Sequence, residues 1–345
     1  MDMVAIEVAV WAILVMVGIG IAIAIGIMVM VEVGMVVMVE AVEERSRSQS
    51  RIAIAVDILG KASMKANILL EGDIATGKTT SLRTLLPTYI DERGTKHKGA
   101  GLDTYIISLD PGLQASLGPN LCSVKDDGRD DDNSKGAHWH YLRPPLLSPD
   151  VSMKWAIAAN EAPTLERLKN VPDPTKRNYT QFLSLYRLLH NFQCQGCNAN
   201  FGSVYQMDER HAFVLDGLTG IGEAAQRNYV GSRPPVEWLE YRWIQNGIYN
   251  LINEFWKCTS CSAIVIAHLE RENDPDQGVS YVTMRAIGQK LAKLLEMIPD
   301  DIIVTHQREG KFTWDTSERG MHLKSRHLPS TNNLPPDFTQ IFARR

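Results

Sequence analysis

One segment of this sequence has the residue types and spacing of a phosphate-binding loop. The glycines Gly72 and Gly77 permit backbone conformations that turn successive N–H groups toward an anion. Lys78 supplies a cation for the β- and γ-phosphates of a nucleotide, and the Thr79 hydroxyl supplies a ligand for Mg²⁺. These features predict binding of ATP with Mg²⁺. The predicted cradle comprises Gly72, Asp73, Ile74, Ala75, Thr76, Gly77, Lys78, Thr79 and Thr80.

The residues on either side of the loop predict the strand and the helix that it requires. Residues 67–70 form a short apolar run typical of a buried parallel strand. Residues 79–86 have helical spacing, and Pro87 predicts the end of that helix. Strand, glycine loop and helix in this order are the context in which the motif is informative. We therefore expect an α/β fold with a mainly parallel sheet flanked by helices.

Three further apolar runs each end at a polar residue. The first ends in Asp216, which we predict to be the Walker B acid, the carboxylate that joins Thr79 in the Mg²⁺ site. The run 262–267 precedes His268, predicted to sense the γ-phosphate, with a strand-capping histidine as the alternative. The run 104–109 precedes Asp110, which either orients the attacking water or begins a turn.

The C-terminal third predicts a second kind of strand pairing. Residues 301–326 alternate strand-like runs with turns, which indicates an antiparallel extension of the sheet. The segment 236–256 predicts an amphipathic helix packed on the core. Its apolar stripe comprises Leu239, Trp243, Ile248, Leu251, Ile252 and Phe255.

The order of these motifs resembles the RecA-core ATPases of phages, the group described as AAA-type phage nucleotide-binding proteins. The resemblance covers residues 60–340, which we take as a RecA-like P-loop ATPase domain. It is carried by the phosphate loop, the strand that precedes Asp110, Val214-Leu215-Asp216-Gly217-Leu218-Thr219, Val265-Ile266-Ala267-His268 and Lys324-Ser325-Arg326 before Leu328-Pro329. The segments His138-Trp139-His140-Tyr141 and Ala286-Ile287-Gly288-Gln289-Lys290-Leu291 add to it.

The resemblance implies an oligomeric, ATP-hydrolysing enzyme of phage-type DNA recombination or replication. Single-stranded DNA and a single-strand-binding or annealing protein are the implied partners. Lys324 and Arg326 match a position that can reach a neighbour's nucleotide as an arginine finger, with a solvated basic strand end as the alternative. The acid after the second strand is typically Glu in this group, whereas Asp110 stands here, so the rate of hydrolysis is not predicted.

In a RecA-like core, the loops that contact single-stranded DNA follow the strands that here lead to Asp216 and His268. The first is 217–235, which holds Arg227, Tyr229 and Arg233, a set suited to phosphate contact and base stacking. The second is 270–284, whose net acidic charge argues against DNA contact. The formal net charge of −4 excludes a globally basic protein, so any DNA contact must be local.

Two cysteine pairs have metal-ligand spacing, namely Cys194 with Cys197 and Cys258 with Cys261. Each pair precedes one of two strands that are adjacent in a RecA-like sheet. Four thiolates at that edge would form a closed structural Zn²⁺ site. The alternative is two unrelated thiol pairs.

The first 50 residues are hydrophobic and of low complexity. The uncharged run 8–31 is long enough as a helix to span a bilayer, and Arg45, Arg47 and Arg51 after it would place the ATPase domain in the cytoplasm. A repeat expansion or a mis-annotated start is the alternative. A membrane-tethered NTPase switch and a P-loop small-molecule kinase are the competing functions, although no arginine-rich lid of a kinase is visible.

Overall fold

The structure is a computed structural model and describes residues 65–123, 136–145, 179–231, 237–274, 279–286, 289–317 and 323–342, with a few single positions besides. These residues belong to one compact unit, Ser63–Arg344. The hydrophobic run 8–31 lies outside the described residues, so its role as a membrane span stays a prediction. Among the helices that are described, none is long and apolar enough to cross a membrane.

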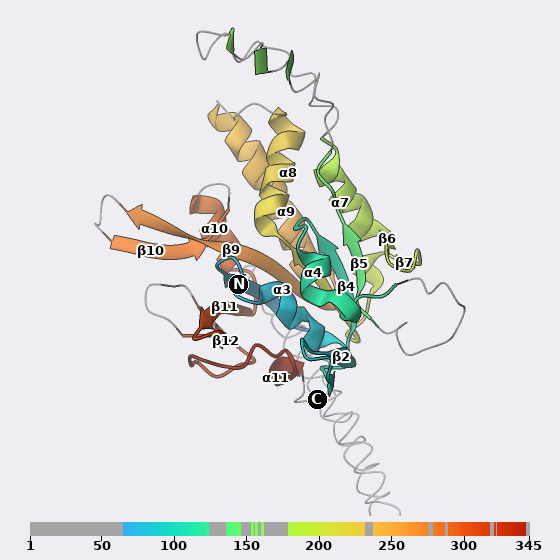
Figure 1. The fold of residues 1–345 in the computed structure, drawn as a ribbon. Coiled ribbons are helices and arrows are strands. Elements are labelled where there is room, and N and C mark those ends of the chain that lie inside the picture. Colours follow the sequence, from blue (N-terminus) through green and yellow to red (C-terminus); the bar gives the residue numbers. More distant parts are fainter. Residues whose placement is uncertain are drawn as a thin grey trace, which may run out of the picture. The chain divides into compact units, whose positions relative to one another are not determined.

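A mostly parallel sheet organises this unit (Figure 1). Its path runs β12-β11-β1-β9-β8-β4-β5, and β10 pairs with β9. The parallel strands are β1 (Asn67–Gly72), β4 (Asp103–Ser108), β5 (His138–Tyr141), β8 (His211–Asp216), β9 (Ser262–Asp274) and β11 (Asp301–Arg308). The antiparallel strands are β12 (Lys311–Asp315) and β10 (Val279–Met284). The predicted α/β class and the antiparallel extension are confirmed.

Helices connect and cover these strands. The larger ones are α7 (Gln181–His190), α8 (Leu218–Val230), α9 (Trp238–Cys258) and α10 (Gln289–Glu296). The short ones are α3 (Lys78–Ser81), α4 (Leu113–Leu117), α11 (Thr339–Phe342) and the 3₁₀ turns η1 (Leu82–Leu85), η2 (Gly118–Asn120) and η5 (Val204–Gln206). Two small hairpins complete the described part, β2 (Thr88–Ile90) with β3 (Lys96–Lys98) and β6 (Phe192–Gln193) with β7 (Asn200–Gly202).

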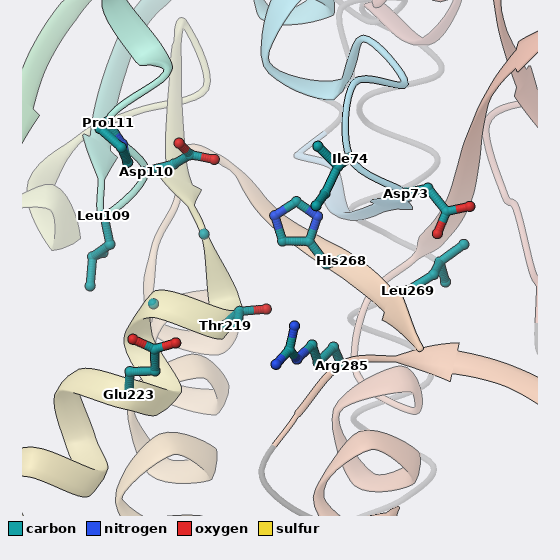
Figure 2. Close-up of a pocket in the computed structure, with 12 residues that line it drawn as sticks. Asp73, Ile74, Leu109, Asp110, Pro111, Thr219, Glu223, His268, Leu269 and Arg285 are labelled. Carbon is teal, nitrogen blue, oxygen red and sulfur yellow. The ribbon is translucent and has the colours of Figure 1, made fainter. Parts of the chain in front are cut away.

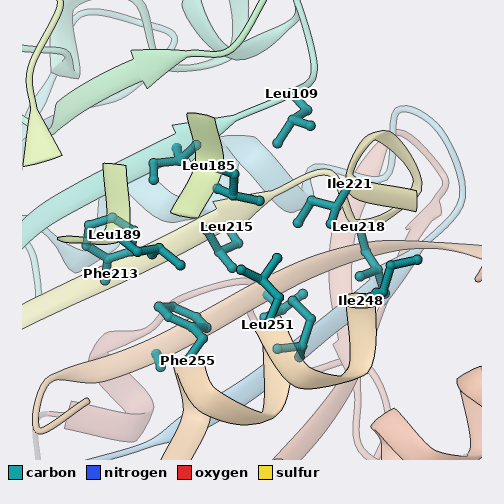
Figure 3. Packing of buried hydrophobic residues seen from close by; sticks show 14 of the residues in the cluster. Leu109, Leu185, Leu189, Phe213, Leu215, Leu218, Ile221, Ile248, Leu251 and Phe255 are labelled. Atoms are coloured by element: carbon teal, nitrogen blue, oxygen red, sulfur yellow. The ribbon is translucent and has the colours of Figure 1, made fainter. Parts of the chain in front are cut away.

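The alternation of side chains along each strand creates two hydrophobic cores, one on each face of the sheet. In β8, Phe213 and Leu215 face the core formed with α7, α8, α9 and α10, which Figure 3 shows from close by. Val214 of the same strand faces the second core, formed with η1, α4 and α11. Because successive side chains of a strand point to opposite faces, strands buried on both faces are continuously apolar. This explains why the strand runs are recognisable from sequence.

The structure corrects the predicted apolar stripe of α9, because only its C-terminal part is buried. Ile248, Leu251, Ile252 and Phe255 are buried as expected, but the side chain of Leu239 is 47% exposed and that of Trp243 is 52% exposed. The first turns of α9 therefore do not pack their predicted stripe on the core. The helix begins at a capping box in which Glu237 and Glu240 exchange bonds with each other's backbone N–H groups, which stabilises this partly solvated end.

The carboxyl group of Glu71, near the end of β1, is buried and not fully hydrogen-bonded. Glu71 is only 4% exposed, and its Oε1 has no hydrogen-bond partner among the described residues. Burial, with a smaller contribution from the charge of Glu296, raises the pKa of Glu71 to about 8 from its ordinary value of 4.5. Near neutral pH the folded chain therefore holds a proton on Glu71, whereas the unfolded chain has already released it above its ordinary pKa of 4.5.

Replacing Glu71 by Gln tests this protonation. The folded pKa is raised, so the wild type should lose stability as the pH rises from about 4.5 toward about 8. The loss should amount to a few kcal/mol, since each unit of pKa shift is worth about 1.4 kcal/mol. Denaturant unfolding over this pH range should show the loss for the wild type and a flatter profile for Glu71→Gln. The exposed Glu92→Gln should behave like the wild type; parallel profiles for all three chains would contradict a buried neutral Glu71.

Candidate functional site

The loop that follows β1 has two positions in the left-handed backbone region. Ala75 has φ 61° and Gly77 has φ 83°. The Thr76 hydroxyl between them donates to the Asp73 carbonyl oxygen at 2.8 Å, which closes the loop on itself. Left-handed residues set among ordinary ones turn neighbouring N–H groups toward a common point, the arrangement that binds anions. The helix after the loop is short, because α3 passes into η1 after a single turn.

Gly72 is required for a reason other than the one we expected. Its φ does not lie in the left-handed region, but a Cβ there would lie 2.0 Å from Thr305 Oγ1 and 2.8 Å from the Thr305 carbonyl oxygen. Thr305 lies on β11, and its hydroxyl donates to the Glu71 carbonyl oxygen at 3.0 Å. The close approach of β11 to the end of β1 is therefore what excludes a side chain at Gly72.

Lys78 is buried beneath the loop. Its Nζ donates to the carbonyl oxygens of Gly72 at 2.7 Å and Asp73 at 2.6 Å, and it lies 3.4 Å from His268 Nδ1. Burial lowers the pKa of Lys78 to about 8, while the charge of Asp216 opposes this shift. The amine is thus a fixed donor at the centre of the loop.

Asp216 ends β8 beside this lysine. Both of its carboxylate oxygens lie 3.5 Å from Thr79 Oγ1, and the Ser108 hydroxyl donates to Oδ2 at 3.2 Å. Burial, with a smaller contribution from the neighbouring charge of Asp110, raises the pKa of Asp216 to about 7. Sequence reasoning missed Ser108, although its place as the last residue of the strand beside β8 could have indicated it.

His268 lies next to Gly72 in the sheet register, but β9 does not end there. The strand continues to Asp274 and pairs with β10, which corrects the prediction that His268 stands at a strand tip. Burial and the Lys78 charge lower the pKa of His268. The imidazole is therefore neutral near pH 7, with Nδ1 available to accept a hydrogen from the lysine.

Asp110 begins a turn, the second of the two predicted possibilities, and its role in orienting water stays a prediction. Its Oδ1 accepts a hydrogen bond from the Gly112 backbone N–H at 2.8 Å, so it begins a turn. The residue also lines the cavities beside the loop. One carboxylate oxygen thus has a structural partner, and the side chain still borders the space next to Asp216.

Two adjoining cavities lie beside the loop. The smaller is about 300 Å³ and contains Lys78 and Asp216, and the larger is about 650 Å³. Figure 2 shows Asp110, His268 and Arg285 around the larger one. Sequence reasoning missed Arg285 and Phe312, for which no motif gives a signal. The smaller cavity is lined by Ile74, Ala75, Thr76, Gly77, Lys78, Thr79, Thr80, Asp110, Gly112, Ser116, Asp216, Gly217, Ile266, His268 and Phe312.

Lys324 and Arg326 lie away from this chain's own loop. Arg326 Nη1 forms an ion pair with Asp300 Oδ1 at 2.8 Å, just before β11 begins. That is the opposite end of the strands from Gly72, because the beginning of β11 pairs with the beginning of β1. The two basic residues therefore do not join the site within one chain, and a role in a neighbour's site stays a prediction.

The two predicted DNA-contacting loops are largely regular structure. Residues 218–230 form α8, in which Arg227 lies 5.8 Å from the Tyr179 ring centroid and 3.7 Å from Glu223. Tyr229 packs against the hydrophobic core, and Arg233 lies outside the described residues. Most of 270–284 belongs to the β9–β10 hairpin. The prediction that these two segments are loops is therefore wrong in its secondary structure, and DNA contact by the first segment stays a prediction.

The cysteine pairs do not combine as predicted. Cys194 and Cys197 lie with Cys122 and His138 in one cluster whose ligand atoms are within 4.8 Å of one another. Cys258 and Cys261 are not members of that cluster; Cys258 is exposed at the end of α9, and Cys261 is buried directly before β9. The proposed set of four thiolates is therefore corrected to three thiols and one imidazole.

No protein-family model matches this chain, and no curated protein matches it in sequence.

Two substitutions in the loop test its backbone conformation. An Ala at position 77 would be left-handed and its Cβ would lie 2.7 Å from the Phe312 ring, so Gly77→Ala should lower the unfolding free energy by about 1–2 kcal/mol or more. Ala75→Gly removes a left-handed Cβ and should change stability by less than about 0.5 kcal/mol, because relief of strain offsets the flexibility of glycine. Urea unfolding of both variants is the measurement. Equal losses would contradict the described loop.

Proposed function

We propose that this chain is a Mg²⁺-dependent ATPase with a RecA-like core. The observation that carries the proposal is the convergence of Lys78, Thr79 and Asp216 on one cavity beside the loop 72–79. A lysine within a glycine loop, a hydroxyl after it and a buried acid on a nearby strand are the groups that phosphoryl transfer requires. The adjacent, parallel pairing of β8 and β9 supports a RecA-like arrangement.

The oxygen atoms of Thr79 on α3 and of Asp216 at the end of β8 fit a magnesium ion. Thr79 Oγ1 and the Asp216 carboxylate are hard oxygen donors placed side by side, and the hydrogen-bond partners of Asp216 are hydroxyls. When bound, Mg²⁺ would neutralise the carboxylate and polarise phosphate oxygens. Asp110 adds negative charge close to Asp216, which favours a cation further.

Three side chains supply donors for the phosphates of ATP. Lys78 would exchange its carbonyl partners for phosphate oxygens, a stronger charge-assisted interaction. His268, which accepts through Nδ1, keeps a proton on Nε2 that it can donate. Arg285 lines the larger cavity, and its backbone N–H donates to the His268 carbonyl oxygen at 2.6 Å, so β10 positions it.

Asp110 is the acid we propose to orient the attacking water. It borders both cavities, so it lies between the Mg²⁺ site and the larger space in which water would approach. Its Oδ1 is held by the Gly112 N–H, which fixes the carboxylate and leaves Oδ2 for a water molecule. Loss of this residue should therefore reduce turnover more than it reduces ATP binding.

The role in DNA recombination or replication extends this proposal by the sequence resemblance alone. Assembly into an oligomer would explain a basic segment far from the chain's own loop, because Arg326 could then serve a neighbour's nucleotide. Its ion pair with Asp300 would have to open on assembly. DNA and oligomer dependence are thus separable from ATP hydrolysis itself.

ATP hydrolysis by the full chain with Mg²⁺ tests the enzymatic proposal. Lys78→Ala should lower kcat/KM by about 100-fold or more, because it removes the charge that stabilises the transferring phosphoryl group. Lys98→Ala, which removes an exposed lysine of β3, should hydrolyse ATP like the wild type. Asp110→Asn should lower kcat while ATP affinity changes little. Equal activity of Lys78→Ala and the wild type would refute the proposal.

Single-stranded DNA added to the same assay tests the biological extension. Stimulation that weakens as the salt concentration rises is expected if DNA contacts basic residues near the site. If DNA of every length leaves the rate unchanged while Lys78→Ala remains inactive, the chain is an ATPase and the recombination role is wrong.

A further inference from the structure

A second cluster of reactive side chains lies at the other end of the strands. His138 begins β5, and Cys122 lies beside it through a parallel bridge between Leu121 and Ala137. Cys194 and Cys197 come from the turn between β6 and β7. Three separate chain segments thus meet at one point. Nothing in the proposed ATPase chemistry uses them, since Lys78 and Asp216 lie at the opposite, carboxyl ends of the strands.

The spacing of the four ligand atoms matches a tetrahedral zinc site. Zn–S bonds of about 2.3 Å place two sulfurs about 3.8 Å apart, and a nitrogen and a sulfur about 3.6 Å apart. Cys197 Sγ lies 3.5 Å from His138 Nδ1, Cys122 Sγ lies 3.1 Å from Cys194 Sγ, and all four ligand atoms are within 4.8 Å of one another. Binding of the ion would require small shifts of the side chains, including a longer separation between Cys122 and Cys194.

Backbone bonds build this arrangement without any ion. The Gln195 backbone N–H donates to the Trp139 carbonyl oxygen at 2.8 Å, and the Gln195 side chain bonds the N–H and carbonyl of Tyr141. The turn thereby covers the free edge of β5. Gly196 is required here, because a Cβ would lie 2.1 Å from the Cys122 carbonyl oxygen.

The surroundings bury two of the four ligands, while His138 and Cys197 are partly exposed. Cys194 is fully buried and Cys122 is 3% exposed. The His138 ring stacks on Tyr105 at 5.2 Å and contacts Phe201 at 4.2 Å between centroids, which fixes its orientation. The Trp139 backbone N–H donates to the Cys194 sulfur at 3.4 Å, a bond that favours the thiolate form.

We propose that Cys122, His138, Cys194 and Cys197 bind one Zn²⁺ ion as a closed structural site. Four protein ligands leave no open position, so the ion has no catalytic role. It would clamp the β6–β7 turn onto the β5 edge of the sheet. Three thiols release their protons on binding, and the neutral imidazole retains its Nε2 proton. The competing outcome is a Cys122–Cys194 disulfide, which would need an external oxidant.

Metal analysis of the purified full chain tests the site. The wild type, expressed with zinc in the medium and freed of any affinity tag, should carry about one zinc per chain. Cys197→Ser and His138→Asn should lose most of it. Cys258→Ser is the matched control, because it makes the same change in an exposed cysteine outside the cluster. It should retain the wild-type content.

Cobalt substitution reads the ligand set in the wild type itself, so the test does not rest only on variants that lose the metal. Wild type and Cys258→Ser loaded with Co²⁺ should show the absorption of a tetrahedral thiolate site, and His138→Cys should keep a tetrahedral but shifted spectrum. Wild-type chain with neither zinc nor a cobalt spectrum would overturn the proposal. So would fewer than five free thiols in the unfolded, metal-free wild type, which shows a disulfide. Equal zinc loss in Cys258→Ser and Cys197→Ser would instead implicate the other cysteine pair.

The zinc site and the ATPase proposal can fail separately. Lys78→Ala should bind zinc like the wild type, because the lysine lies at the other end of the strands. Zinc loss in Lys78→Ala would contradict the independence of the two sites.

Discussion

The hydrogen-bond register among β1, β9, β8 and β4 determines where the polar groups of the candidate site lie. Gly72 of β1 pairs with His268 of β9, and Asp216 of β8 pairs with Ser108 of β4. Because these strands are parallel, their carboxyl ends meet at one edge, and the residues that follow them share one space. A shift of β8 by a single residue would turn Asp216 toward the opposite face. The chemistry proposed for the site therefore depends on strand pairing before it depends on any single side chain.

Burial gives this edge its electrostatic character. The pKa of Lys78 is lowered to about 8 and that of Asp216 is raised to about 7, both chiefly by burial. Each shift disfavours the charged form, and each would be reversed by an opposite charge close by. A phosphate beside the lysine and a divalent cation beside the aspartate satisfy both groups at once. The strands β11 and β12 add the constraint that keeps the loop in place, through Thr305 and Phe312.

Local sequence patterns predicted the strands well and the long-range contacts poorly. The runs 68–70 and 212–215 are continuously apolar, because both faces of those strands are buried, so β1 and β8 were recognisable. The extension of β9 past His268 depends on pairing with β10, which no local pattern reveals. Cys122 and His138 were missed as members of the cluster with Cys194 and Cys197 for the same reason, since Cys122 is a single cysteine far in sequence from Cys194. Its role depends on the parallel bridge that brings it to His138.

A crystal structure of the full chain grown with Mn²⁺ and a non-hydrolysable ATP analogue would test the central claim most directly. Manganese replaces Mg²⁺ at oxygen sites and can be located by its anomalous scattering. The account predicts the manganese between Thr79 and Asp216, with the β- and γ-phosphates against Lys78 and the loop 72–79. Phosphates bound elsewhere, or a metal ion that contacts neither Thr79 nor Asp216, would contradict it.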